Sequence, residues 1–202
     1  MAEATSTSFD PPGSGEATPS PRKTELLERA YQYALQHGVA NISLRPLASA
    51  IGSSPRVLLY LFGSKDGLVR ALLARARAEE LRLLEQLRAE RGAEHTGLAV
   101  VVERIWDWLA AEDRRGLLSL WVEGYARSLI DPEGPWAGFA EDTVDDWLKL
   151  LAEHQPAGER DTAEAKARRT EALAVLRGAL LDLLATGDRA RVTAAVHAWT
   201  SR

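Results

Sequence analysis

The sequence predicts an all-α fold, and three observations lead to this prediction. Leu, Ala, Arg and Glu, all good helix formers, dominate the 202 residues. No stretch has the β-branched, alternating pattern of a strand. Residues that cap or break helices separate the apolar-periodic segments. We therefore expect about nine helices, divided between a three-helix amino-terminal domain and a larger helical body.

Two short helices with a tight turn between them follow a longer first helix. The first helix is expected at about 22–37, where Leu26, Ala30 and Ala34 share one face. The second is expected to begin at Ser43, a good N-cap, and to end at Gly52. Because glycine adopts the left-handed conformation at little cost, it suits the end of a helix.

The third helix has the clearest start of the three. Ser54 is a good N-cap and Pro55 occupies the first helical position, which is the preferred arrangement. The helix is expected to run through Phe62 and to stop at Gly63. Two helices with this spacing form a helix-turn-helix, whose second helix lies in the major groove of DNA.

Six further helices are expected in the body. The fourth is too long to belong to the small domain alone, so it is expected to link the two domains until Gly92 breaks it. Asp161 and Glu164 are expected to pair at the start of the eighth helix, and Asp188 is expected to cap the ninth. The six helices are expected at about 64–91, 96–111, 114–130, 136–154, 161–187 and 188–202.

The segment 54–68 resembles the signature of the tetracycline-repressor (TetR) family, in which a Ser-capped recognition helix ends at an aromatic residue. There a Ser-Lys-acid-x-Leu step opens the next helix, as Ser64 to Leu68 do here. The resemblance extends over about 22–72 and implies nine helices, a DNA-binding domain, a homodimer and an effector pocket. Arg56 and Leu61 replace the family's usual Gly and His, so the family's base contacts do not transfer directly.

The charge distribution favours a DNA reader attached to a body that does not touch DNA. Residues 21–75 hold eight Lys and Arg against three acids, a net charge of +5, although the whole chain carries −4. Residues 1–20 carry −3 and are rich in Ser, Thr, Gly and Pro, so they are expected to form a disordered tail. We expect a helix-turn-helix domain at 21–67 and an effector-binding and dimerisation domain at 68–202.

Three cations are the first candidates for DNA contact. Lys65 lies at the first position of a helix, where a cation opposes the helix dipole, so a nearby phosphate is expected. Arg45 begins the supporting helix, which crosses the DNA backbone, and is expected to contact a phosphate or the groove edge. Arg56 faces the groove and reads either a guanine or a phosphate; both alternatives stay open.

The other DNA candidates lie on the same short helix. Tyr60 is one turn from Arg56 and offers a hydroxyl group to a phosphate. Leu59 stands at the family's usual Tyr position and either touches a thymine methyl group or is merely exposed. Ser54 and Pro55, which begin the helix, complete the expected DNA-binding set.

A cluster of aromatic residues predicts a pocket for a small effector. Five of the six tryptophans fall between positions 106 and 147. Trp121 and Tyr125 are four residues apart and share a helix face. The resemblance implies a pocket enclosed by the fifth to seventh helices, and an aromatic lining favours an apolar or aromatic ligand. The candidates are Trp106, Trp121, Tyr125 and Trp147, and the alternative for each is ordinary core packing.

The last two helices predict an association surface. Their apolar stripes are broader than one partner helix covers, which favours a four-helix bundle with a second copy of the chain. Gly178 in mid-helix suits a close approach of two backbones. The expected interface residues are Leu173, Leu176, Gly178, Leu180, Leu184, Val192, Val196 and Trp199.

No cofactor or metal site is expected. The chain has no cysteine, no Gly-rich phosphate loop and no Gly-x-Ser-x-Gly elbow, and its four histidines are scattered. It has no signal-like or membrane-spanning apolar run, so a cytoplasmic protein is expected. We expect a repressor, not an enzyme, that releases a palindromic double-stranded operator on binding its effector. A helical-bundle enzyme and a helical adaptor without DNA binding are the alternatives.

Overall fold

A computed structural model describes residues 20–39, 42–89 and 97–202. These ranges contain nine α-helices, one short 3-10 helix and no strand, which confirms the all-α prediction. The expected tail at 1–20, apart from Ser20, and the expected helix break at Gly92 lie outside the described residues, and the Ser20 side chain caps the first helix. The elements are α1 (Pro21–His37), α2 (Leu44–Ala50), α3 (Pro55–Phe62), α4 (Lys65–Ala89), α5 (Leu98–Leu109), η2 (Glu112–Arg114), α6 (Arg115–Ile130), α7 (Phe139–Glu153), α8 (Ala163–Thr186) and α9 (Arg189–Thr200).

Side chains cap several helices where the sequence predicts it. The Ser54 hydroxyl accepts a hydrogen bond from the Val57 N–H, and the Asp188 carboxylate accepts one from the Arg191 N–H. The α8 prediction is wrong by one residue, because Thr162 and not Asp161 caps that helix. The threonine hydroxyl reaches the free N–H of Ala165, three residues on, and so satisfies a group that the helix itself leaves unpaired.

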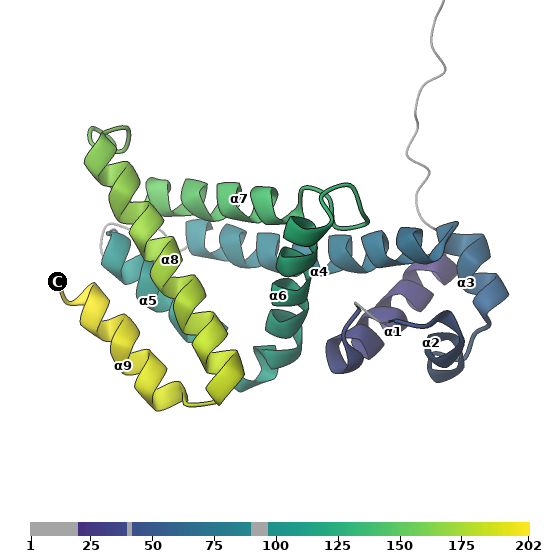
Figure 1. The fold of residues 1–202 in the computed structure, drawn as a ribbon. Helices are drawn as coiled ribbons and strands as arrows, with labels where there is room; N and C mark the ends of the chain where they lie inside the picture. Colours follow the sequence, from purple (N-terminus) through teal and green to yellow (C-terminus); the bar gives the residue numbers. More distant parts are fainter. Residues whose placement is uncertain (1–19, 40–41, 90–96) are drawn as a thin grey trace, which may run out of the picture.

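The helices are arranged around α4. Figure 1 shows α1, α2 and α3 gathered at one end of α4, while α7 lies along its other end. The helices α8 and α9 pack on α5 and on each other, at the carboxyl end of the chain. The helix α4 contacts α1 and α3 as well as α6 and α7. One continuous helix therefore joins the amino-terminal module (α1 to α3) to the body (α5 to α9). No described helix is long and apolar enough to cross a membrane.

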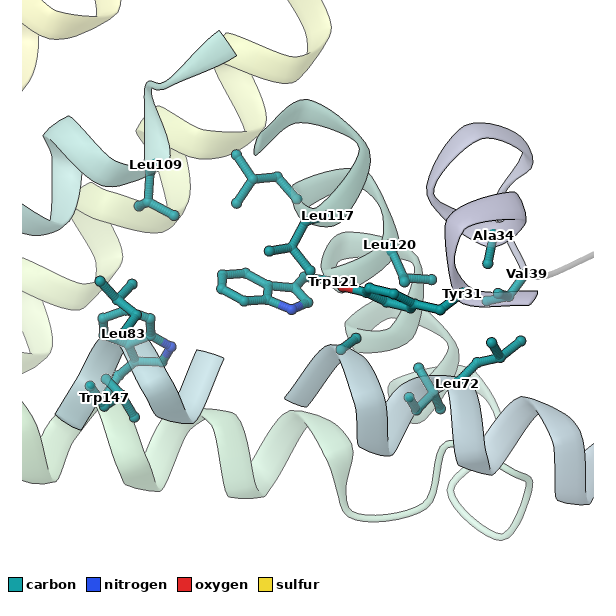
Figure 2. Close-up of a cluster of buried hydrophobic side chains, with 14 of the residues drawn as sticks. Tyr31, Ala34, Val39, Leu72, Leu83, Leu109, Leu117, Leu120, Trp121 and Trp147 are labelled. Carbon is teal, nitrogen blue, oxygen red and sulfur yellow. The ribbon is translucent and has the colours of Figure 1, made fainter. Parts of the chain in front are cut away.

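The helix α6 is a second connection between the two parts. Figure 2 shows Leu120 on the side of α6 that faces Tyr31 of α1, and Trp121 on the side that faces the body. Gly116 lies so close to α1 that a Cβ atom there would come within 2.5 Å of the Leu35 carbonyl oxygen. The Glu123 carboxylate accepts a hydrogen bond of 2.9 Å from the Val39 N–H, directly after α1. The amino-terminal module is therefore held by both α4 and α6.

Candidate functional site

The helix-turn-helix consists of α2 and α3. The turn contains Gly52 with φ of 68°, in the left-handed region that glycine adopts most easily. The Ser53 N–H donates to the Ala48 carbonyl oxygen at 2.8 Å, which closes the turn. Leu47 and Leu58 are fully buried between the helices and fix their relative orientation. The rigid turn therefore determines which face of α3 is presented to solvent.

The outward face of α3 carries the residues that the sequence assigns to DNA. Tyr60 is 86% exposed and Leu59 is 41% exposed. Arg56 is exposed one turn before Tyr60, on the same side of the helix. Leu58 and Phe62 point inward and are buried. An exposed arginine, leucine and tyrosine on a capped helix suit contacts with base edges and phosphates.

A hollow beside α3 collects positive charge at the start of three helices. Arg45 from α2, Pro55 from α3 and Lys65 from α4 line it together. Within the described residues, Arg45, Arg56 and Lys65 have no acidic partner, whereas Arg29 and Arg75 of the same module pair with glutamates. Unpaired cations around a hollow at the start of α4 form a site suited to a phosphate.

Sequence reasoning missed Ser43 as a member of this group. Ser43 precedes α2 in the N-cap position, but its hydroxyl makes no capping hydrogen bond. The residue is exposed and lines the same hollow as Arg45 and Lys65. A hydroxyl group that no helix end uses is available to a phosphate oxygen.

The body contains an apolar cavity of about 280 Å³ between α4, α5, α6, α7 and α8. Trp121 and Tyr125 of α6 and Trp147 of α7 line it, so three of the four predicted pocket residues lie together. Figure 2 shows Trp121 and Trp147 extending from their helices toward a common space. The lining residues are Glu80, Ile105, Leu109, Trp121, Val122, Tyr125, Ala126, Leu129, Phe139, Thr143, Trp147, Leu173, Leu176, Arg177, Leu180 and Leu181.

The fourth expected pocket residue, Trp106, lies outside the lining of this cavity. Its indole N–H donates to the Thr193 hydroxyl at 3.0 Å, so the ring is fixed between α5 and α9 and is fully buried. Trp108, on the opposite face of α5, instead stacks on Trp121 with ring centroids 5.6 Å apart. The stack supports Trp121 in the cavity wall from behind.

A buried carboxylate, Glu80 of α4, forms part of the cavity wall. One of its oxygens accepts a hydrogen bond of 2.5 Å from the Trp147 indole N–H, and the other pairs with Arg77. Arg77 also pairs with Asp146 of α7 and donates to the Asp142 carbonyl oxygen. Burial raises the pKa of the Glu80 carboxyl, and this effect outweighs the opposite effect of Arg77.

Arg177 of α8 is the second charged group in the wall. Its guanidinium carbon lies 5.0 Å from the centroid of the Tyr125 ring, a cation–π geometry. Its Nη2 atom is buried and has no hydrogen-bond partner among the described residues, and the same holds for the Trp121 indole nitrogen. These two donors differ from those of the Glu80 cluster, which are all paired.

The sequence contained a signal for both charged residues. Glu80 falls at a position that helical spacing from Ala76 and Leu84 assigns to the core, and Arg177 interrupts the apolar face formed by Leu173 and Leu180. A charged residue at a core position of a helix is expected to be paired or functional.

The expected association residues separate into two groups. Leu173, Leu176, Val192, Val196 and Trp199 are buried within the single chain. The reason is that α8 and α9 turn these side chains toward α5 and the cavity. Leu180 and Leu184 are half-buried, and Gly178 is exposed with open space at its Cα atom.

A different face of α8 and α9 is exposed. On α8 it carries Ala174, Gly178 and Ala185, at the spacing of one helix face. On α9 the exposed face carries Ala190, Ala194 and Ala198. Small residues along both helices allow another backbone to approach closely.

Comparisons with known proteins agree with this architecture. Residues 26–72 match the family model described as bacterial regulatory proteins, tetR family. By sequence, no curated protein matches the chain. By structure, a TetR transcription regulator from Haloarcula marismortui is 15% identical with a TM-score of 0.69, covering 90% of this chain and 95% of its own.

Two further solved structures are similar over nearly their whole length. GusR of Salmonella enterica is 18% identical with a TM-score of 0.66, covering 92% of this chain and 96% of its own. The multidrug binding protein EbrR, complexed with proflavin, is 21% identical with a TM-score of 0.60, covering 87% of this chain and 97% of its own. Residues 26–72 are therefore similar to the tetR-family model, and the chain as a whole has the fold of solved TetR-family transcriptional regulators.

Proposed function

We propose that this protein is a ligand-responsive transcriptional regulator, most simply a repressor, that releases its operator when a small apolar or aromatic molecule enters the cavity. The observation that carries the proposal is that α4 and α6 each line the cavity and each contact the amino-terminal module. A ligand that changes the position of either helix therefore changes the position of α3. Such coupling requires the ligand to bind the two arrangements with different affinity.

The DNA-binding part of the proposal rests on α3 and the hollow beside it. Arg56, Leu59 and Tyr60 face the groove, while Arg45 and Lys65 contact phosphates on either side, and Ser54 and Pro55 set the start of the helix. The family assignment of this module supports the same reading.

A homodimer completes the regulator. Two copies of α3 related by a two-fold axis read a palindromic operator, with half-sites about one turn of DNA apart or a multiple of it. The small exposed residues of α8 and α9 support a four-helix bundle as the dimer interface. We place this regulator in the cytoplasm, where it reaches DNA.

The ligand-binding part rests on the cavity lining. Aromatic rings and aliphatic side chains make up almost all of it, which suits an apolar body. The structural neighbour EbrR was solved in complex with proflavin, an aromatic molecule, which supports an aromatic effector.

The test separates DNA binding from ligand response. An operator is first selected from random double-stranded DNA, and its release is measured by fluorescence anisotropy against a set of apolar and aromatic compounds. Ala126→Phe, which fills the cavity from α6, is expected to abolish release and to leave operator affinity without ligand unchanged. Ala137→Phe adds the same ring at an exposed position outside the cavity lining and is expected to respond like the parent protein. Equal release from both variants would contradict the proposed location of the effector.

A further inference from the structure

Arg177 is a cation without an acid. It lies on α8 between two cavity-lining residues, Leu176 and Leu180, yet no carboxylate of the described residues pairs with it. Its Nη2 atom is buried without an acceptor. Leaving a buried donor unpaired destabilises a fold, more so when the donor is charged. A retained cation in such a place indicates that its acceptor comes from outside the chain.

Glu80, the acidic residue in the cavity wall, does not pair with Arg177. Both oxygens of Glu80 already accept hydrogen bonds, one from Trp147 and the other from Arg77. Arg77 also pairs with Asp146, so these charged groups pair with one another. In the cavity wall, the Glu80 carboxylate of α4 therefore has hydrogen-bond donors, whereas the Arg177 Nη2 atom of α8 has no acceptor among the described residues.

The wall around Arg177 is arranged to receive an anion. The Tyr125 ring supports the guanidinium group from one side, 5.0 Å from its carbon. One helical turn earlier on α6, Trp121 is 8% exposed and its indole N–H has no acceptor among the described residues. A carboxylate accepts two hydrogen bonds from an arginine in a planar, paired geometry, which no neutral acceptor matches in strength.

The position of Arg177 also orients such a ligand. Leu129 at 65% exposure and Leu181 at 52% exposure both line the cavity, so its rim includes these two exposed residues of α6 and α8. Arg177 is half-buried and directly precedes this rim on α8. Deeper in the cavity the lining consists of aromatic and aliphatic groups, among them Phe139 and Trp147. A molecule with a charged head and an apolar body fits head outward.

We infer that the effector of this protein is an amphipathic carboxylic acid, whose carboxylate pairs with Arg177 at the cavity rim and whose apolar body lies among Trp121, Phe139 and Trp147. This inference deepens the proposed function and rests on it. The cavity of about 280 Å³ lies at the lower end of the range for small-molecule sites, so the body is compact.

The test uses matched probes that differ only in the head group. Binding of 2-naphthoate, 2-naphthamide and 2-naphthylmethylamine to the full chain is measured by calorimetry without DNA, and decanoate with decanamide repeats the comparison on an aliphatic body. We expect the carboxylate to bind at least tenfold more tightly than the amide of the same body, and the ammonium compound to bind most weakly.

Arg177→Met keeps most of the side-chain volume and removes the charge. It is expected to lose the preference for carboxylate while its affinity for the amide stays within about threefold. Lys166→Met makes the same change of charge at an exposed position of α8 outside the cavity and is expected to keep the preference. Sedimentation of both variants checks the alternative that Arg177 meets an acid of a second copy: dimer loss in Arg177→Met with an unchanged head-group preference overturns the inference.

Failure of the inference and failure of the proposed function are distinguishable. If the amide or the ammonium compound binds as tightly as the carboxylate, or if no carboxylate probe of either body binds, the effector is not an amphipathic acid. If the carboxylate binds through Arg177 but leaves operator affinity unchanged, the site assignment stands and the sensor function fails.

Discussion

At the scale of single residues, Glu79 and Glu80 show how the position of a carboxyl group in the fold decides the direction in which its pKa shifts. They are neighbours on α4, but only Glu80 points into the core, where it is fully buried. Burial raises the pKa of the Glu80 carboxyl. Glu79 is partly desolvated too, but hydrogen bonds from Arg75 and Arg82 outweigh that effect and lower its pKa.

The two carboxyl groups are expected to affect stability in opposite directions as pH changes. Because the folded pKa of Glu80 lies above the ordinary value of 4.5, the unfolded chain ionises first, and the free energy of unfolding falls as pH rises from 4.5 through the folded pKa. Glu79 contributes stability that is present above its unfolded pKa and is lost as pH falls through its lowered folded pKa.

Glu80→Gln and Glu79→Gln therefore form a matched pair for urea unfolding across the acid and neutral range. Relative to the parent protein, Glu80→Gln is expected to remove a decline of stability with rising pH. Glu79→Gln is expected to remove a gain of stability with rising pH and to cost up to about 1 kcal/mol at neutral pH. Difference slopes of the same sign would contradict the assignment of the two environments.

Arg56 and Lys65 are expected to fail differently when each is replaced by alanine. If Arg56 pairs with a guanine, Arg56→Ala costs about 1–3 kcal/mol at one operator position and relaxes the base preference there. Lys65→Ala weakens binding to all sequences and lowers the slope of affinity against salt concentration by about one. Fluorescence anisotropy on operator and random DNA at several salt concentrations distinguishes the two variants. If Arg56→Ala lost equal affinity for both DNAs, Arg56 would be a phosphate contact and not a base contact.

At the scale of elements, α6 connects the amino-terminal helices to the cavity, as the long α4 does. The sequence predicted α4 as the link because of its length, whereas the contacts of α6 with α1 depend on side chains far apart in the sequence. Gly116 allows the first turn of α6 to approach the carboxyl-terminal part of α1, and Glu123 binds the Val39 N–H two turns later. The opposite side of the same helix lines the cavity.

Gly116→Ala is expected to loosen this contact. Its Cβ atom would come within 2.5 Å of the Leu35 carbonyl oxygen, so α6 or α1 has to move, at a cost of about 1–3 kcal/mol. Alanine favours a helix over glycine, so the loss would arise in spite of helix propensity. Thermal unfolding measures it, with Ser119→Ala at an exposed position of α6 as the control; a more stable Gly116→Ala protein would contradict the tight contact.

At the scale of the whole molecule, the three candidate sites lie in different parts of the fold. The unpaired cations of the hollow lie at the end of α4 where the chain enters it, and the cavity lies among the helices of the body. The exposed faces of α8 and α9 lie at the carboxyl end, away from the helix-turn-helix (Figure 1). The dimer interface proposed there leaves both recognition helices free for DNA.

Gly178→Leu is expected to weaken the dimer without unfolding the chain. Within one chain a Cβ atom at Gly178 meets nothing within 4 Å, and leucine favours a helix more than glycine does. A larger side chain there would keep two copies of α8 apart. Sedimentation should show monomers at concentrations where Gly158→Leu, which adds the same side chain at another open glycine, remains dimeric. A Gly178→Leu dimer as tight as that of the control would place the interface elsewhere.

The sequence by itself determined the helices and the exposed face of α3. Capping by Ser54 and Asp188, the glycines that end helices and the apolar spacing within each helix are local features. They therefore predict helix ends and inward residues such as Leu26. The exposure of Tyr60 follows from the same short-range pattern.

Only the tertiary structure decided which faces of the body helices meet one another. Helical spacing groups Leu173 with Leu180 and Val192 with Val196, but it does not distinguish a face that packs on α5 or the cavity from one that packs on a second chain. For the same reason Trp106 was assigned to the pocket although it bonds to Thr193 of α9. Glu80 and Arg177 acquire their roles from partners more than fifty residues away, or from the lack of one, because burial and pairing depend on contacts that no local pattern contains.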